Sequence, residues 1–212
     1  APGAGILLKA SGSITTNSSR TIQTNGGDIT LWADADGTND GQILTNDANK
    51  LDSRTATDRT AANTLTATGG GTITLGGGGE SVTLTSGTSV PTGFASNSTG
   101  PGVRFGSTIS GTTTTLLLSG GGDVVVRGKG TGSTGHGIIN YNALEINTGT
   151  GALQLEGESK NTFGLPLSNK VNFQSAASSG KAIKLIGVSS SNAIGLQLGS
   201  SNSSSGPSIV AA

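Results

Sequence analysis

Residues 118–157 read LSGGGDVVVRGKGTGSTGHGIINYNALEINTGTGALQLEG, and this stretch decides the fold. Apolar residues alternate with polar ones in short bursts, which glycine, serine, threonine and asparagine separate. Alternation with a period of two is typical of β-strands, and no window shows the sustained spacing of a helix. Two of these bursts begin close together, at Leu144 and at Leu153. The stretch therefore predicts short strands joined by tight turns.

One unit from this stretch recurs along the chain: two glycines, any residue, an apolar residue, any residue and an apolar residue. It occurs as GGDVVV at 121–126, as GGDITL at 26–31 and as GGTITL at 70–75, with looser copies at 150–155 and 179–185. Each copy buries only two or three side chains, because every second side chain points to the opposite face. One unit alone cannot cover its apolar face, whereas stacked units can.

These repeats predict an all-β fold, a right-handed parallel β-helix (β-solenoid) that forms a single domain over residues 1–212. Three short strands and three turns make one rung of about 20–25 residues, which gives roughly nine rungs. Isoleucine, leucine and valine stack inside, and glycine allows the tight corners. A sandwich of antiparallel hairpins is the rival interpretation, but a chain with only 3% aromatic residues lacks the usual sandwich core.

Composition excludes several partners. The formal net charge is zero and only 11% of the residues are charged, so we expect no binding to nucleic acid. The apolar runs are too short for membrane insertion. The chain has no cysteine, which excludes disulfides and thiolate metal sites and suits a protein that is exported unfolded.

The stretches at 21–37, 66–79 and 118–157 resemble the repeats of filamentous-haemagglutinin-type bacterial exoproteins, which often use two-partner secretion. The resemblance covers roughly residues 10–200. It implies a β-helix and an extracellular, secreted or cell-surface location in a bacterium. Such repeats form the shafts of adhesins, toxin-delivery stalks and biofilm matrix proteins, and the family offers no catalytic residue to carry over.

A cluster of oxygen-bearing side chains follows the strand predicted at 29–33. Asp34, Asp36, Asn39 and Asp40 offer the ligands that calcium prefers. Their spacing departs from that of a helix-loop-helix calcium loop, and the distal glutamate of such loops is missing. The cluster also occurs once, unlike the calcium repeats of β-helices. We therefore expect a polar turn in the first place, with calcium as the one possible cofactor.

Trp32 lies within the same predicted strand, and alternation points its side chain outward. An exposed tryptophan is costly to leave in water. Either a loop of the chain folds over Trp32, or Trp32 contacts a partner such as a glycan or a neighbouring subunit.

Candidate catalytic residues are sparse. Asp123 with Arg127, and Glu145 with Glu156, could serve a polysaccharide-cleaving site, but sugar-cleaving grooves also need aromatic platforms. The single histidine, His136, has no nucleophile-elbow motif around it. The expectation is that this chain is not an enzyme.

The two ends of the sequence are apolar, APGAGILLKA at 1–10 and GPSIVAA at 206–212, and neither contains an amphipathic helix that could cap a solenoid. Together with the start at Ala1 and the absence of a visible signal peptide, this suggests a segment or subunit of a longer fibre. The expected function is therefore structural: a cell-surface fibre, sheath or adhesin shaft that could assemble end to end. The alternative is an adhesin module that binds a glycan or a host-surface receptor through a lateral face.

Overall fold

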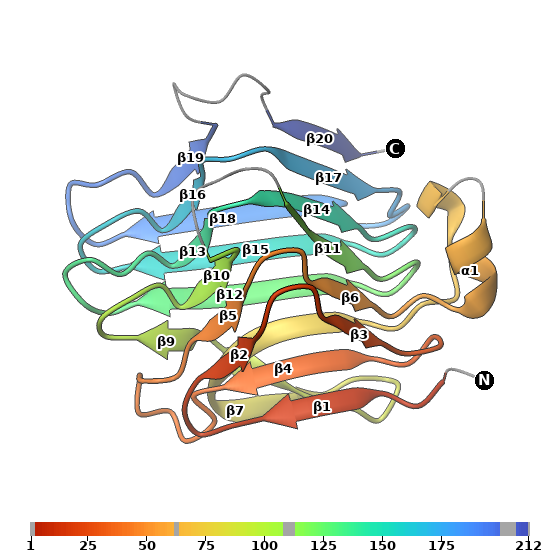
Figure 1. Ribbon diagram of the computed structural model, residues 1–212, viewed down its shortest axis with the longest axis horizontal. Coiled ribbons are helices and arrows are strands. Elements are labelled where there is room, and N and C mark those ends of the chain that lie inside the picture. Colours follow the sequence, from red (N-terminus) through yellow and green to blue (C-terminus); the bar gives the residue numbers. More distant parts are fainter. Residues whose placement is uncertain (1–2, 62–63, 108–112, 200–206, 212) are drawn as a thin grey trace.

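The computed structural model describes residues 3–61, 64–107, 113–199 and 207–211. It is built from stacked rungs, which follow one another from the N-terminal to the C-terminal part of the chain and contribute their strands to parallel sheets (Figure 1). This arrangement agrees with the predicted β-solenoid.

Three sheets run along the stack. The first, sheet A, follows the path β1 (Ile6–Lys9), β4 (Ile29–Ala33), β7 (Ile73–Thr83), β12 (Val124–Gly130), β15 (Leu153–Ser159) and β18 (Ile183–Ser189). Sheet B contains β2 (Ile14–Thr16), β5 (Ile43–Thr45), β10 (Val103–Phe105) and β13 (Ile138–Asn140). The paired strands β16 (Leu165–Leu167) and β19 (Leu196–Leu198) continue sheet B, because the Ile138 amide beside them donates a hydrogen bond to the Gly164 carbonyl. Sheet C contains β3 (Thr21–Gln23), β6 (Lys50–Asp52), β11 (Thr114–Leu118), β14 (Ala143–Asn147), β17 (Val171–Ser175) and β20 (Ser208–Ala211).

The strand order of sheets A and C runs through six strands each, so the expectation of roughly nine rungs is not confirmed. Rungs are longer than the repeat suggested. Register partners in sheet A are 23 residues apart in the first rung (6 to 29) but 51 residues apart in the third (73 to 124). One insertion lengthens the second rung, where register partners are 44 residues apart (29 to 73), and another lengthens the third; both are described below.

Apolar side chains form columns inside the coil, because each inward residue pairs with its counterpart in the next rung. One column in sheet A runs through Ile29, Ile73, Val124 and Leu153, and each of these side chains has no exposed surface. Sheet C supplies a facing column through Leu51, Leu117, Ile146 and Phe173. Burial of such aliphatic side chains stabilises a fold by about 1.5–3 kcal/mol each.

The glycine pair of the repeat has a specific place, at the corner where sheet C leads into sheet A. A Cβ atom on Gly122 would lie 2.3 Å from the Gly71 carbonyl carbon, and one on Gly151 would lie 2.1 Å from the Gly122 oxygen. Backbones of successive rungs therefore approach too closely here for any side chain. This close approach explains the second glycine of the unit, although the sequence suggested only a tight turn.

Buried hydroxyl groups support the same corner. Thr24, Ser53, Ser119 and Thr148 each donate to the carbonyl oxygen of a corner glycine: Gly27, Gly71, Gly122 and Gly151 respectively. These hydroxyls satisfy carbonyl groups that the tight corner would otherwise bury without a partner.

One insertion leaves the coil in the second rung and the other in the third. The first follows β6 and contains helix α1 (Ala56–Thr60) and the short 3-10 helix η1 (Thr64–Thr66); Figure 1 shows it at one side of the stack. The second is an antiparallel hairpin of β7 with β8 (Ser89–Gly93), after which β9 (Ala95–Asn97) rejoins sheet A beside β12. The hairpin thus interrupts a strand of sheet A rather than a turn.

Candidate functional site

The predicted calcium ligands lie in the turn after β4, and Asp34 organises this turn. Asp34 has only 1% exposed surface, and its Oδ1 accepts the backbone N–H groups of Asn39 at 3.0 Å and Asp40 at 3.4 Å. Burial raises the pKa of Asp34, and these two hydrogen bonds counteract the rise. Asp34 and Asn39 both adopt positive φ, of 50° and 66°, which aspartate and asparagine tolerate better than most residues.

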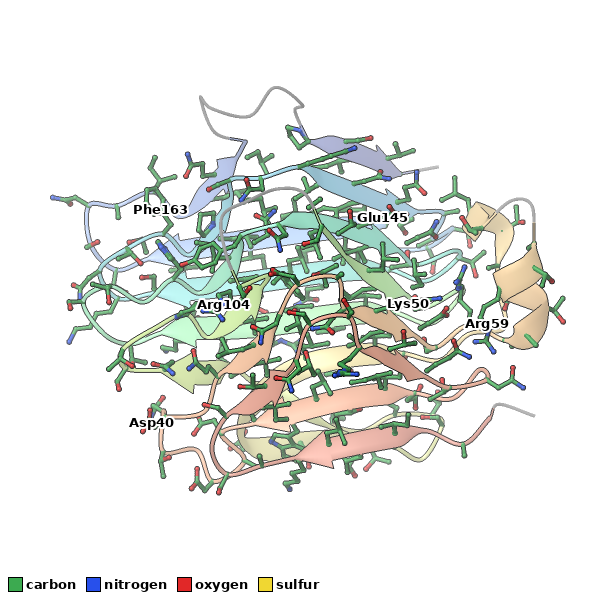
Figure 2. All side chains as sticks on the ribbon, viewed as in Figure 1. Asp40, Lys50, Arg59, Arg104, Glu145 and Phe163 are labelled. Carbon is green, nitrogen blue, oxygen red and sulfur yellow. The ribbon has the colours of Figure 1, made fainter. Side chains whose placement is uncertain are left out.

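The other candidate ligands do not converge on Asp34. Asp36, Asn39 and Asp40 are exposed. The Asp36 Oδ1 accepts hydrogen bonds from the backbone N–H and the hydroxyl of Thr38. Asp40 lies at the rim of the molecule, away from the sheets (Figure 2). Within the described residues, no group of three or more His, Cys, Asp or Glu side chains is placed to hold a metal ion. The Asp34 Oδ1 is thus engaged by the backbone of its own turn, and calcium binding there stays a prediction.

Trp32 has 3% exposed surface, so its cover comes from the chain itself. Its Nε1 donates to the Gly78 carbonyl at 2.8 Å, where the hairpin leaves sheet A, and the Lys9 Nζ lies 3.7 Å from the ring centroid. The outward direction agrees with the alternation of β4, since Leu31 and Ala33 are the core residues. Trp32 is not available as a partner contact in this structure, because the hairpin and Lys9 enclose the ring.

The residues weighed for catalysis are separated. Arg127 pairs with Glu156, with Nε and Oε2 3.3 Å apart, and Glu145 lies on sheet C rather than sheet A (Figure 2). The Asp123 Oδ1 accepts the backbone N–H of Ala152 at 2.8 Å, which links neighbouring rungs. Asp28, two rungs earlier in the stack, accepts the backbone N–H of Thr72 in the same way. The aspartate of the repeat unit thus closes a rung-to-rung contact.

His136 is half-buried beside Phe163, with ring centroids 5.8 Å apart. Its Nδ1 lies 3.1 Å from the Thr162 hydroxyl, and no carboxylate in the described part of the chain forms an ion pair with it. Burial lowers the pKa of His136, so the ring is held neutral near pH 7.

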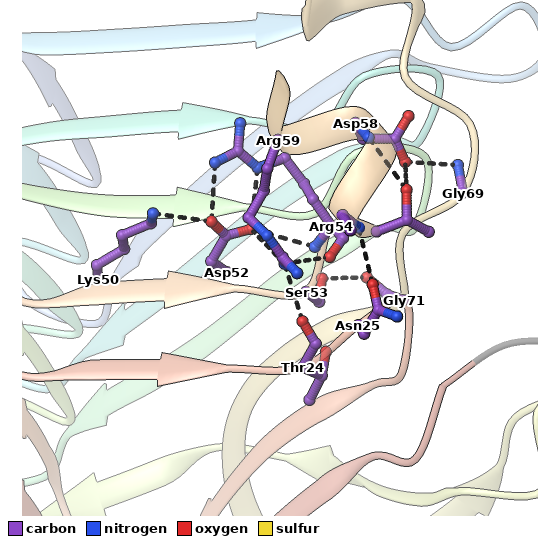
Figure 3. Close-up of polar contacts among 12 residues, drawn as sticks. Thr24, Asn25, Lys50, Asp52, Ser53, Arg54, Asp58, Arg59, Gly69 and Gly71 are labelled. Carbon is purple, nitrogen blue, oxygen red and sulfur yellow. Dashed lines mark hydrogen bonds and ion pairs between the residues drawn. The ribbon is translucent and has the colours of Figure 1, made fainter. Parts of the chain in front are cut away.

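Sequence reasoning missed a buried carboxylate, Asp52, which lies outside the coil at the base of the first insertion. Asp52 has no exposed surface and contacts Lys50 at 2.9 Å and Arg54 at 2.8 Å, with Arg59 of α1 3.9 Å away (Figure 3). Burial alone would raise its pKa, but the hydrogen bonds from Arg54 and Lys50 lower it overall. The cluster attaches the insertion to the solenoid.

Arg59 extends this attachment, because its guanidinium also donates to the carbonyl of Thr24 at 2.9 Å in the neighbouring rung. Alternation within β6 signals that Asp52 points outward, opposite to Leu51. Only the insertion, which no periodic pattern predicts, makes the outward position a buried one.

A polar groove lies between the two insertions. Its volume is about 630 Å³, and its lining combines Thr55 and the 68–71 loop from the first insertion with Leu84 and Ser86 from the hairpin. Asp28 and Asp123 lie on the sheet A side of the groove. The lining has carboxylates, hydroxyls and backbone groups, but neither a cationic nor an aromatic side chain. Such a surface suits an uncharged, hydroxyl-rich ligand better than an anion.

Comparisons with known proteins identify no relative: no family model, no curated protein and no solved structure matches this chain. None of the helices in the described ranges is long and apolar enough to cross a membrane.

Proposed function

We propose that this chain is a structural segment of an extracellular bacterial fibre, sheath or adhesin shaft, and not an enzyme. One observation carries the proposal: two inward columns of sheet A stay apolar through every rung, including the first and the last. Ile6 and Leu8 begin the sheet A columns, and Ile183 and Leu185 end them. A solenoid that ends at a cap changes to polar residues in its terminal repeats. The sheet A columns show no such change within the described rungs, which is typical of a shaft.

The mechanism is mechanical. Each rung adds a row of backbone hydrogen bonds to three sheets and buries its apolar side chains against the next rung. The corner glycines and hydroxyls let the rungs stack at strand spacing. We expect the coil to be right-handed, since parallel connections of this kind almost always take that hand. The resemblance of 118–157 to exoprotein repeats supports the extracellular setting.

Single-molecule force spectroscopy tests the structural role, combined with limited proteolysis of the same protein. We expect a high-force unfolding event and a protease-resistant fragment that retains all three sheets, with cleavage confined to the insertions. A low-force, gradual extension or early cleavage within 124–175 would contradict a load-bearing shaft.

The groove between the insertions favours a second candidate, an adhesin module that binds a glycan. Insertions in repeat proteins often carry the binding face. Deleting residues 77–94 joins Gly76 to Ala95, which restores an uninterrupted strand because Leu75 pairs with Val126 and Ala95 with Gly128. Glycan-array binding by the full chain that this deletion abolishes would establish the adhesin function. Absence of saturable binding to any glycan would leave the shaft as the proposed role.

A further inference from the structure

The two ends of the coil expose residues that belong to its core columns. At the C-terminal end face, formed by β18, β19 and β20, the exposed fractions are 38% for Leu196, 45% for Leu198 and 39% for Ile209. The corresponding side chains one rung earlier, Leu165, Leu167 and Phe173, have none. At the N-terminal end face, formed by β1, β2 and β3, Leu8 is 39% exposed, and Ile14 and Ile22 are half-buried.

The two end faces are opposite edges of the same sheets. All rung-to-rung pairs in these sheets are parallel: β1 with β4 begins sheet A and β15 with β18 ends it. A second copy that is shifted along the coil axis would therefore pair β18 with β1, β19 with β2 and β20 with β3, all of them parallel. Free strand edges of this kind favour pairing with another chain.

Side chains match in the register that the columns define. Extending each column by one rung places Ile183 against Ile6, Leu185 against Leu8 and Ile209 against Ile22. The outward positions bring no two like charges together, since Lys184 would meet Leu7 and Lys9 would meet Ile186. With a formal net charge of zero, the copies also lack long-range repulsion.

We propose that copies of this chain stack head to tail, the C-terminal end face of one copy on the N-terminal end face of the next. This inference rests on the proposed shaft function and names the partner as a second copy. The contact is heterologous, because two different faces meet, and a translation along the axis does not close. Such contacts generate filaments rather than dimers.

Two variants that each block one face test the inference. Leu8→Asp places a charge in the N-terminal end face, and Leu196→Asp places one in the C-terminal end face. By analytical ultracentrifugation and electron microscopy, the unmodified chain should form filaments whose length grows with concentration. Each variant alone should associate at least a hundredfold more weakly and remain monomeric.

Mixing the two variants in equal amounts gives the decisive result. The head-to-tail contact predicts a dimer and nothing longer, because one intact face of each kind remains. Dimers in either variant alone would indicate contacts between like faces and overturn the proposal. Val82→Asp is the matched control, since Val82 is a 51% exposed apolar residue on the hairpin, and its filaments should be unchanged.

Folding of every variant is checked by circular dichroism, and a second pair, Ile14→Lys and Ile209→Lys, repeats the design on the other sheets. An unmodified chain that stays monomeric at high concentration overturns self-stacking. That outcome leaves the shaft function intact, since its own tests are mechanical resistance and protease resistance.

Discussion

The fifth and sixth rungs contain the same kinds of residue in the same register, yet only the fifth is buried. Leu155 has no exposed surface, whereas its partner Leu185 is only half-buried; Phe173 is buried, whereas its partner Ile209 is 39% exposed. The difference comes from the neighbour and not from the residue, because a rung is fully buried only when another rung covers it on each side. In this fold, burial is a property of the stack.

The largest effect should come from the corner where rungs approach most closely. Gly122→Ala places a Cβ 2.3 Å from the Gly71 backbone, which cannot move without displacing a whole rung. We expect a loss of at least about 3 kcal/mol in the free energy of unfolding, or failure to fold. Chemical denaturation measures it.

Gly79→Ala is the matched control for this substitution, because nothing lies within 4 Å of a Cβ built there. Equal stability of the two variants would show that close stacking at the corner is not what the glycine column provides.

Truncating the same kind of side chain in the fifth and in the sixth rung compares the stability that each rung derives from burial. Leu155→Ala leaves a cavity in a covered column and should cost about 2–5 kcal/mol. Leu185→Ala should cost less than half as much, because water already reaches that side chain. Thermal and urea unfolding, at a concentration where the chain is monomeric, measure both. A larger loss for Leu185 would mean that the last rung is covered in solution.

The insertion offers a local contrast to the columns. Asp52→Asn removes the carboxylate that holds three cations, and we expect a loss of about 1–3 kcal/mol, moderated because solvent reaches those cations. Trypsin should then cleave at Arg59 faster, while the sheets stay resistant. Asp58→Asn serves as the comparison, because Asp58 belongs to α1 whereas Asp52 ends β6.

The ion cluster around Asp52 also predicts that the stability of the protein depends on pH. The folded-state pKa of Asp52 lies below its ordinary value of 3.8, so its contribution is present above that pH. It is lost as the pH falls through the folded-state pKa. The acid sensitivity of the parent should therefore exceed that of Asp52→Asn below about pH 4. Identical acid profiles would refute a stabilising role for this ion cluster.

The smallest effect concerns the contact between the hairpin and sheet A. Trp32→Phe removes one hydrogen bond to Gly78 and should cost about 0.5–1.5 kcal/mol. Since the chain has a single tryptophan, its fluorescence reports this contact directly. Deleting residues 77–94 should shift the emission to the red and increase acrylamide quenching. Unchanged emission would mean that the hairpin does not cover Trp32 in solution.

The sequence by itself determined the strand class and the direction of the side chains. Alternation at 26–31, 70–75 and 121–126 places inward and outward residues as the structure has them, because a strand has a period of two. It also determined that stacking was needed, since no single unit covers its own apolar face. The outward direction of Trp32 and the turn at 34–40 follow from the same local rules.

Only the tertiary structure decided how many rungs form and what covers the outward residues. The insertion at α1 and the hairpin at β7–β8 carry no periodic signal, yet they lengthen the second and third rungs, bury Asp52 and enclose Trp32. The local conformation of the turn after β4 is likewise set by hydrogen bonds, since the Asp34 carboxylate accepts backbone N–H groups of Asn39 and Asp40. Contacts between segments far apart in the chain depend on packing, which short-range patterns do not encode.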